Sequence, residues 1–286
     1  MHIEHVNILG LDVGGTSIKV GRYDSAGNEL STDRIPTADW RGNFTERLLA
    51  YLENQGSFQA AGIGLPGMIS RDRSTPIMIE AIRELDEVNM LEQLQQRFPN
   101  ARFRLENDAM CAALGLQETM PEIGDSYLWI GFGTGLASAS IMEGAPFLGP
   151  RGNALELGFV PMADGGHFEG NVGVQGLLRK YKSLGMSEVT AHQLCDYLNN
   201  GSAISGEVLD YMSAQLKQVL AQALLSFDLR TIAFGGGNAP KSSAFYDTLR
   251  QNLCAILPPY WHDVKLVRVE ASPFMAARGA AMLVTN

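Results

Sequence analysis

Residues near the amino terminus could bind a phosphate group and a metal ion. Asp12 ends an apolar run and is followed by Gly14, Gly15 and Thr16. Adjacent glycines let backbone N–H groups approach an anion without interference from a Cβ atom, and Thr16 adds a hydroxyl donor. The Asp12 carboxylate is a hard oxygen ligand suited to Mg²⁺, directly or through water. These residues therefore predict a phosphate-binding loop with a metal-holding aspartate.

The segment after the glycines distinguishes this loop from other nucleotide-binding loops. Ile18, Val20 and Arg22 alternate with the intervening residues, and a hairpin signal follows at residues 24–27. A P-loop or a dinucleotide loop would instead open a helix whose dipole faces the phosphate. The loop is therefore expected to join two strands, which indicates an actin-like fold and not a P-loop or Rossmann fold.

The same order of features recurs later in the chain. Apolar residues 128–130 are followed by Gly133, Thr134 and Gly135, and then by a second apolar run and a turn. Thr134 lies 118 residues after Thr16, and the two units share order and spacing more than identity. Such a repeat predicts an α/β, two-domain actin-like (ribonuclease H-like) fold with a nucleotide and sugar cleft between the domains. One glycine loop would bind the nucleotide phosphates from each side.

Asp108 has two competing interpretations. It stands between a predicted strand at residues 102–105 and a helix of small residues that begins at Ala109. Asp at such a junction commonly caps the helix, and Asn107 could do the same. Alternatively, the Asp108 carboxylate accepts the proton of a hydroxyl that attacks a γ-phosphate. The presence of two phosphate loops favours the second interpretation, with Asn107 capping the helix while Asp108 reaches out.

Residues 62–67 formally match the dinucleotide motif GxGxxG after a predicted strand. A dinucleotide site would require a helix to begin there. Residues 68–76 are rich in polar side chains and show no apolar stripe before Pro76. We therefore expect a loop at this point and no Rossmann site.

Composition limits the classes of function. The chain has 286 residues, 45% of them hydrophobic, and a net charge of −9, which argues against a nucleic-acid-binding surface. Its cysteines (Cys111, Cys195 and Cys254) are far apart and form no CxxC, so a disulfide framework or a thiolate zinc site is not expected. No apolar run approaches the roughly 18 residues of a membrane span, and the amino-terminal segment lacks the cationic stretch of a signal peptide. A cytoplasmic protein without membrane partners is expected.

These motifs, taken in order, resemble those of the ROK sugar kinases over about residues 8–283. The matching segments are, in chain order, the first phosphate motif, the sugar-side loop, the segment with a sugar-binding Asn and a catalytic Asp, the second phosphate motif and the adenosine-side glycines. They are residues 12–19, 62–67, 106–113, 133–135 and 235–237.

The resemblance implies an ATP-dependent phosphorylation of a sugar primary hydroxyl, O6 of a hexose, an N-acetylhexosamine or a β-glucoside, in a homodimer that serves carbohydrate metabolism. Asp108 would be the general base. The residues that would bind ATP and Mg²⁺ are Asp12, Gly14, Gly15, Thr16, Gly133, Thr134, Gly135, Gly236 and Gly237. Those that would bind the sugar are Gly67, Asn107, Asp108, Glu156 and Glu169.

One segment departs from the family pattern. The family usually carries Glu-x-Gly-His and then a cysteine-rich zinc motif, whereas Glu156 is followed here by Phe159 and residues 160–173 contain no cysteine. His167 alone cannot form a structural zinc site and is interpreted as a loop histidine, so zinc is expected to be absent. In this respect the chain resembles the β-glucoside kinase branch, and Phe159 would offer an apolar face to an aglycone or an acetyl group. Glu169 is placed by counting back from residues 179–181.

Domain boundaries and alternatives complete the predictions. The amino-terminal domain is expected at residues 1–108 with the final helix at 273–286, and the carboxyl-terminal domain at 109–272. Lys19 is expected to be a solvated strand residue and not a phosphate ligand. The alternative function is a regulatory, sugar-binding ROK protein without kinase activity, but family repressors carry a helix-turn-helix ahead of the first phosphate motif. The short segment before Ile8 leaves no room for one.

Overall fold

The computed structural model describes residues 7–79, 81–270 and 272–285. The amino-terminal residues 1–6, on which the signal-peptide and helix-turn-helix expectations depend, lie outside the described residues. The chain divides into two compact units. Unit 1 comprises Met1–Glu122, Pro146–Ala154 and Ser272–Asn286, and unit 2 comprises Ile123–Ala145 and Leu155–Ala271. The expected boundary after Asp108 therefore falls inside unit 1, at the start of a helix.

A five-stranded sheet in the order β3-β2-β1-β4-β7 forms the centre of unit 1. β2 is antiparallel to both β1 and β3, whereas β4 is parallel to both β1 and β7. The bounds are β1 Ile8–Val13, β2 Ser17–Tyr23, β3 Glu29–Pro36, β4 Ala60–Leu65 and β7 Arg102–Asn107. The strand at β2 confirms that the first glycine loop joins two strands. The short antiparallel pair β5 Met68–Ile69 and β6 Pro76–Ile77 follows residues 62–67, so a hairpin stands where a loop is expected and where a Rossmann fold would have a helix.

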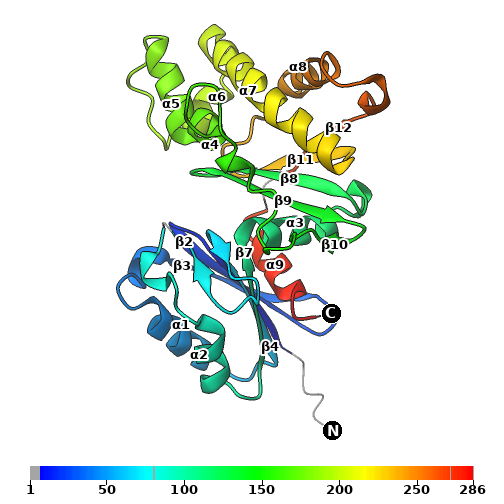
Figure 1. The fold of residues 1–286 in the computed structure, drawn as a ribbon. Helices are drawn as coiled ribbons and strands as arrows, with labels where there is room; N and C mark the ends of the chain where they lie inside the picture. The colour runs from blue at the N-terminus through cyan, green and yellow to red at the C-terminus, as the bar shows by residue number, and fades with distance from the viewer. Residues whose placement is uncertain (1–6, 80, 271, 286) are drawn as a thin grey trace. The chain divides into compact units, whose positions relative to one another are not determined.

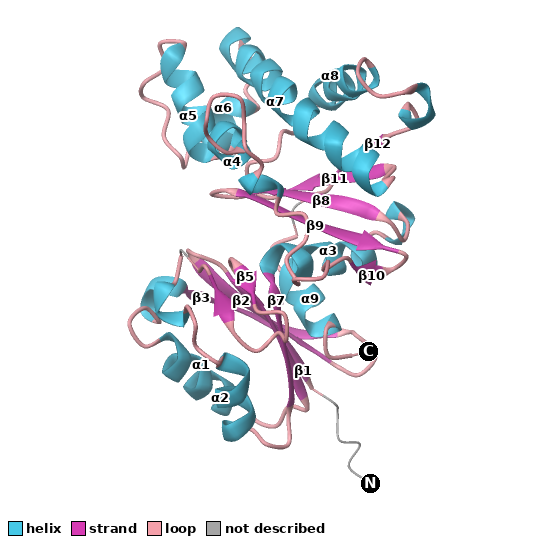
Figure 2. Cartoon of the chain, in the orientation of Figure 1, coloured by secondary structure: helices cyan, strands magenta, loops and turns pink. Residues whose placement is uncertain are grey.

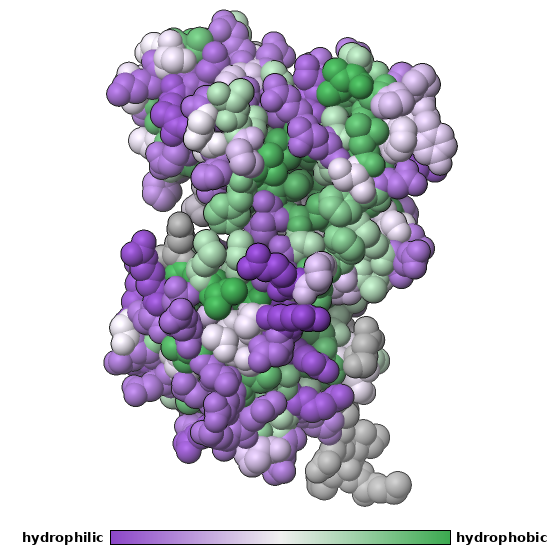
Figure 3. All heavy atoms as spheres, viewed as in Figure 1, coloured by the Kyte–Doolittle hydropathy of each residue, from purple (hydrophilic) through white to green (hydrophobic). Residues whose placement is uncertain are grey.

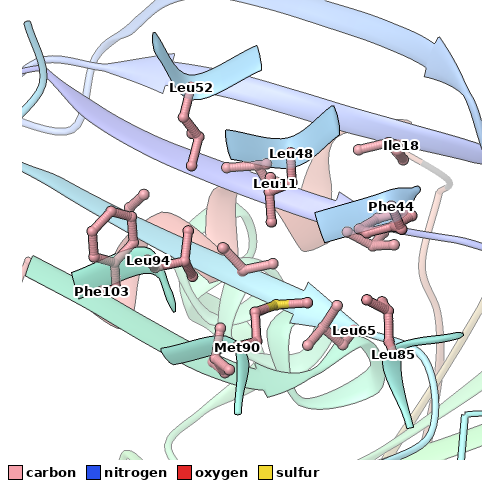
Figure 4. Packing of buried hydrophobic residues seen from close by; sticks show 14 of the residues in the cluster. Leu11, Ile18, Phe44, Leu48, Leu52, Leu65, Leu85, Met90, Leu94 and Phe103 are labelled. Carbon is pink, nitrogen blue, oxygen red and sulfur yellow. The ribbon is translucent and has the colours of Figure 1, made fainter. Parts of the chain in front are cut away.

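Helices cover both faces of this sheet, which explains why every residue of β1 and β4 is buried. α1 and α2 lie on one face, and α3 and α9 lie on the other (Figure 1). The bounds are α1 Phe44–Glu53, α2 Met90–Arg97, α3 Asp108–Thr119 and α9 Met275–Met282. The side chains of Leu11, Leu48, Leu65 and Leu94 interdigitate with those of Phe44 and Phe103 in the core between the sheet and the α1–α2 layer (Figure 4).

The second face packs unusually closely because glycines line it. A Cβ atom on Gly279 of α9 would lie 1.8 Å from the Cys111 carbonyl oxygen of α3, and one on Gly62 of β4 would lie 1.7 Å from the Ala280 carbonyl oxygen. Helix α9 therefore packs backbone to backbone on both α3 and the sheet.

Unit 2 repeats the architecture of unit 1. Its sheet has the order β10-β9-β8-β11-β12, in which β8 and β9 form an antiparallel pair and β11 lies parallel to β8 and β12. The strands are β8 Tyr127–Phe132, β9 Leu136–Met142, β10 Ala145–Pro146, β11 Thr231–Gly235 and β12 Lys265–Arg268. In chain order both sheets run third, second, first, fourth, fifth, which confirms the predicted duplication. The α/β fold class is confirmed as well.

Helices lie on one face of the unit 2 sheet (Figure 2). They are α4 Phe168–Val172, α5 Val174–Ser183, α6 Leu194–Leu198, α7 Ala203–Phe227 and α8 Ser243–Cys254. Single 3₁₀ turns occur at η1 Thr37–Asp39, η2 Arg83–Leu85, η3 Pro121–Ile123, η4 Leu157–Phe159 and η5 Pro259–Trp261.

Hydrophilic side chains cover most of the face shown in Figure 3, and hydrophobic ones gather around the sheet of unit 2. Within the described ranges, no helix has the length and apolarity that a membrane span requires.

Candidate active site

Three predicted residues of unit 1 meet at one edge of its sheet. In the parallel strands β1, β4 and β7, Asp12 is in register with Gly64, Gly64 with Glu106, and Leu65 with Asn107. Ligands of open α/β sheets bind outside the carboxyl ends of such strands. The structure therefore brings Asp12, Asn107 and, one residue on, Asp108 to the edge where a ligand is expected.

Asp12 has a partner that the sequence interpretation missed. The Lys19 ammonium lies 2.7 Å from Asp12 Oδ2, and the two residues are cross-strand neighbours in the β1–β2 pair. The Lys19 side chain is only 24% exposed. The expectation that Lys19 is a solvated strand residue is therefore wrong, because strand register places its ammonium on the aspartate.

The first glycine loop is held firmly by hydrogen bonds to its backbone. Gly14 N–H donates to the Ser17 carbonyl at 3.1 Å, and the Thr37 hydroxyl donates to the Gly14 carbonyl at 2.6 Å. The Thr37 N–H also donates to the Thr16 carbonyl at 3.0 Å. Gly15 and Thr16 remain exposed at the tip. A fixed loop with an exposed tip has the form that a phosphate-binding loop needs.

Asn107, and not Asp108, caps helix α3. Asn107 Oδ1 accepts hydrogen bonds from Ala109 N–H at 2.8 Å and Met110 N–H at 3.3 Å, and Asn107 Nδ2 donates to the Gly67 carbonyl at 2.7 Å. The capping interpretation of Asp108 is therefore wrong. Asp108 is the first residue of α3 and is partly buried. The Asn107 amide retains one N–H for a ligand, since a primary amide carries two.

A buried ion pair lies directly next to Asn107. Glu106 is 5% exposed, its Oε1 accepts the Asn107 N–H at 2.8 Å, and it lies 3.2 Å from the Arg73 guanidinium. Burial raises the pKa of Glu106, while the charge of Arg73 opposes that rise. Arg73 also donates to the Gly152 carbonyl. The sequence interpretation did not assign Arg73, because its contact with Glu106 depends on how the β5–β6 hairpin folds back.

The Cys111 thiol lies beneath the same strand ends. It is fully buried, and burial raises its pKa well above the usual range, with further contributions from the charges of Glu106, Asp12 and Asp108. A neutral, inaccessible thiol is unreactive. Glu106, Asp12 and Asp108 are therefore all close enough to Cys111 to act electrostatically on its thiol.

In unit 2 the second glycine loop, residues 133–135, lies beside a third glycine loop, residues 235–237. Asn238 Nδ2 donates to the Gly133 carbonyl at 2.7 Å, and Asn238 N–H donates to the Phe132 carbonyl at 2.9 Å. Gly236 has a φ of +90°, and a Cβ atom there would lie 2.4 Å from the Phe132 carbonyl oxygen. These bonds bring Gly236 and Gly237 together with the loop at Gly133. Asn238, which joins them, was not singled out from the sequence.

The segment of unit 2 that differs from the family pattern lines a cavity of about 260 Å³. Its lining residues are Leu136, Glu156, Gly158, Phe159, His167, Glu169 and Gly170. The structure therefore brings Glu156 and Glu169 into one cavity, and places Phe159 and His167 there as well. Glu169 Oε2 accepts the Leu136 N–H at 2.8 Å, so this carboxylate also braces the end of the second glycine loop.

Glu156 is held at a strained backbone segment. Its predecessor Leu155 has a φ of +62°, and the buried Ser138 of β9 binds both neighbours of Glu156. The Ser138 hydroxyl donates to the Leu155 carbonyl at 2.6 Å and accepts the Leu157 N–H at 3.0 Å. Burial, and then the charge of Glu169, raise the pKa of Glu156 to about 7. Among the described residues, none donates a hydrogen bond to its carboxylate.

The predicted site residues thus form two groups, each within one unit. Unit 1 contains Asp12, the first glycine loop, Gly67, Asn107 and Asp108, and unit 2 contains the second and third glycine loops, Glu156 and Glu169. The model of the ROK family matches residues 8–286. The chain belongs to the ROK family.

Several curated relatives of this chain are sugar kinases. An N-acetyl-D-glucosamine kinase from Vibrio atlanticus is 25% identical over 96% of this chain and 98% of its own length. A β-glucoside kinase from Klebsiella pneumoniae is 27% identical over 87% of each chain.

Solved structures show the same fold. A putative sugar kinase from Cytophaga hutchinsonii is 29% identical, covers 98% of this chain and 100% of its own, and has a TM-score of 0.82. A ROK family glucokinase from Streptomyces griseus, in complex with glucose and AMPPNP, is 21% identical, covers 97% and 98%, and has a TM-score of 0.79. A ROK family transcriptional regulator is 17% identical with a TM-score of 0.84 and covers 98% of this chain but 78% of its own. These neighbours confirm the actin-like fold.

Proposed function

We propose that this ROK protein transfers the γ-phosphoryl group of ATP to a primary hydroxyl of a sugar, with Asp108 as the general base. The observation that carries the proposal is the position of Asp108. It opens helix α3 at the carboxyl edge of the parallel strands that also present Asp12, while Asn107 satisfies the helix terminus.

Asp108 would accept the proton of the sugar hydroxyl as its oxygen attacks the γ-phosphorus. The O–H bond breaks, an O–P bond forms, and the bond from the γ-phosphorus to the β–γ bridging oxygen breaks, so ADP leaves with that oxygen. Asn107 supplies the cap of helix α3, so the helix does not require Asp108 as its capping residue.

The glycine loops would bind the nucleotide. Gly15 and Thr16 of unit 1, and Thr134 of unit 2, are exposed at the tips of loops fixed by their own backbone bonds. Gly236 and Gly237 would lie against the adenosine. Support for ATP comes from the glucokinase of Streptomyces griseus, whose structure contains AMPPNP.

Asp12 fits the role of a Mg²⁺-holding residue through water. Lys19 occupies only its Oδ2 atom, and one carboxylate together with nucleotide phosphates and water is an ordinary environment for Mg²⁺. Across the described part of the chain, no cluster of three or more His, Cys, Asp and Glu residues could bind a metal by itself, so the phosphates would supply further ligands. When bound, Mg²⁺ neutralises charge on the transferred phosphoryl group.

The sugar would be a hexose, an N-acetylhexosamine or a β-glucoside phosphorylated at O6. Gly67, Asn107 and Asp108 of unit 1 and Glu156 and Glu169 of unit 2 would bind its hydroxyls. Glu156 supports this role because its carboxylate lines a cavity and accepts no hydrogen bond from a described residue. The expected lack of zinc and the expected homodimer remain predictions, which metal analysis and light scattering would check.

A panel of sugars tests the proposal. The protein is incubated with ATP and Mg²⁺ and with glucose, N-acetylglucosamine, N-acetylmannosamine or a β-glucoside, and ADP release and the product are followed by a coupled assay and ³¹P NMR. We expect ADP release that depends on one or more of these sugars and a 6-phosphate product. ADP release that no sugar accelerates would contradict the proposal.

A regulatory, sugar-binding protein without kinase activity is the second candidate, because a ROK transcriptional regulator shares the fold. The same panel separates the two: sugar binding by calorimetry without any ADP release would favour the regulator.

A further inference from the structure

The cavity of unit 2 has two walls with different chemistry. The first wall is η4, where Glu156 precedes the turn and Phe159 ends it. Side chains three residues apart on a 3₁₀ turn project to the same side, so a carboxylate and an aromatic ring face the cavity together. The second wall is the start of α4, which contributes His167 and Glu169.

A closed loop joins the two walls and fixes His167. Phe168 N–H donates to the Val160 carbonyl at 2.9 Å, and Met162 N–H donates to the Gly166 carbonyl at 2.9 Å. Pro161 and His167 form an isolated antiparallel bridge. The His167 ring then meets the Phe159 ring edge to face, with centroids 6.3 Å apart and planes at 75°. The imidazole is therefore held at the cavity by its backbone and by an aromatic neighbour.

His167 supplies what the other lining groups lack. Ionised Glu156 and Glu169 only accept hydrogen bonds, and Glu169 already accepts one from Leu136. Phe159 is 52% exposed and offers an apolar face. Among the residues that line this cavity, His167 is the one whose side chain carries an N–H donor.

We propose that His167 is a specificity-determining residue that recognises an N-acyl group on the sugar, so that the preferred substrate class is a 2-acylamino hexose. The imidazole N–H donates to the acyl carbonyl oxygen, the amide N–H donates to the Glu156 carboxylate, and the methyl group packs on Phe159. This assignment rests on the proposed function, in which this cavity receives the sugar.

Other substituents match the cavity less well. A free hydroxyl would hydrogen-bond to Glu156 or His167 but would leave Phe159 exposed to water. An amino group would satisfy the carboxylates and offer nothing to the imidazole or the ring. An alkyl or aryl aglycone would cover Phe159 but lacks a carbonyl for His167 and an N–H for Glu156. An acylamino group matches all three side chains.

Equilibrium binding tests the assignment without requiring turnover. Calorimetry measures the Kd values of N-acetylglucosamine, glucose and methyl β-glucoside for the wild type, His167→Ala, His167→Asn and the control His192→Ala, an exposed histidine of the same unit. We expect the wild type and His192→Ala to bind N-acetylglucosamine at least about tenfold more tightly than glucose, the factor of one ordinary hydrogen bond. His167→Ala should remove most of this preference, and His167→Asn, which keeps a donor, should retain part of it.

The assignment is overturned if the wild type binds glucose or the β-glucoside as tightly as N-acetylglucosamine, or if His167→Ala leaves the preference unchanged. ADP release from the same proteins separates this outcome from failure of the proposed function. Sugar-dependent ADP release with an unchanged preference would retain the kinase and reject the role of His167. A His167-dependent preference without ADP release would support the role of His167 and reject the kinase.

Discussion

At the residue scale, Glu156 shows how the fold places an acid where ionisation is costly. Ser138 binds the backbone on both sides of it, and Glu169 lies in the same cavity. Burial and that second charge raise the pKa of Glu156 to about 7. A hydrogen bond from a hydroxyl or amide of a bound sugar would stabilise the ionised carboxylate. Sugar binding would therefore offset the cost of ionising Glu156.

This pKa predicts a pH dependence of stability. Between about pH 4.5 and 7 the folded protein binds a proton at Glu156 that the unfolded chain does not, so the free energy of unfolding falls as pH rises. The fall is on the order of 3–4 kcal/mol for this carboxyl, since its pKa rises from 4.5 to about 7 and one pKa unit corresponds to about 1.4 kcal/mol. Urea unfolding at a series of pH values should show Glu156→Gln with a flatter profile and greater stability than the wild type at pH 8.

Glu188→Gln is the matched control, because Glu188 is an exposed glutamate of the same unit. Its profile should follow that of the wild type. His167 and Glu169 line the same cavity in both proteins, so only the difference between the two stability profiles reports on Glu156. Identical slopes for the wild type and Glu156→Gln would show that its pKa is not raised.

A second residue-scale prediction concerns the buried pair of Arg73 and Glu106. The Arg73→Met variant leaves a carboxylate that is 5% exposed without its cation, and we expect a loss of roughly 3 kcal/mol in unfolding free energy. Arg268→Met removes a pair whose glutamate is 88% exposed, and should cost less than about 1 kcal/mol. Chemical denaturation compares the two variants, and equal losses would mean that Arg73 does not stabilise Glu106.

At the element scale, the packing of α9 decides how the chain divides into units. Helix α3 directly follows the predicted boundary, yet it belongs to unit 1 because α9 packs on it through Gly279. The small residues of the final helix permit such close packing, but they do not specify its partner. That partner, α3, is far from α9 in the sequence, so no local sequence pattern predicts the contact.

Two glycine substitutions test this packing. Gly279→Ala gains up to about 1 kcal/mol of helix propensity, but its Cβ would lie 1.8 Å from a carbonyl oxygen. We expect a net loss of roughly 2 kcal/mol or more in unfolding free energy. Gly206→Ala in α7 is the control, since its Cβ would have no atom within 4 Å, and it should gain about 0.5–1 kcal/mol. A neutral or stabilising Gly279→Ala would disprove the close contact.

At the scale of the whole molecule, the duplication could be predicted from the sequence because strand, glycine loop, strand and turn recur in the same order. The structure confirms it in two sheets of the same strand order. Contacts of the site residues with other elements could not be predicted. Lys19 reaches Asp12 through strand register, Ser138 anchors Glu156 across β9, and Asn238 joins two glycine loops. Such contacts depend on tertiary packing, so the sequence predicted the fold and the candidate residues but not the groups that hold them.

The proposed activity draws on groups from both units, and Asp108 is the group on which its chemistry depends. Because Asn107 caps α3, an Asp108→Asn substitution should leave the helix and the fold intact while removing the proton acceptor. A general base contributes about 10²–10⁴-fold to such a reaction. Asp247→Asn is the matched control, an exposed aspartate on α8.

The decisive measurement is therefore the rate of sugar-dependent ADP release by the wild type, Asp108→Asn and Asp247→Asn at saturating ATP, Mg²⁺ and sugar. The account predicts that Asp108→Asn lowers the rate by about 10²–10⁴-fold while Asp247→Asn turns over as the wild type does. An Asp108→Asn protein that releases ADP within about twofold of the wild-type rate would contradict it.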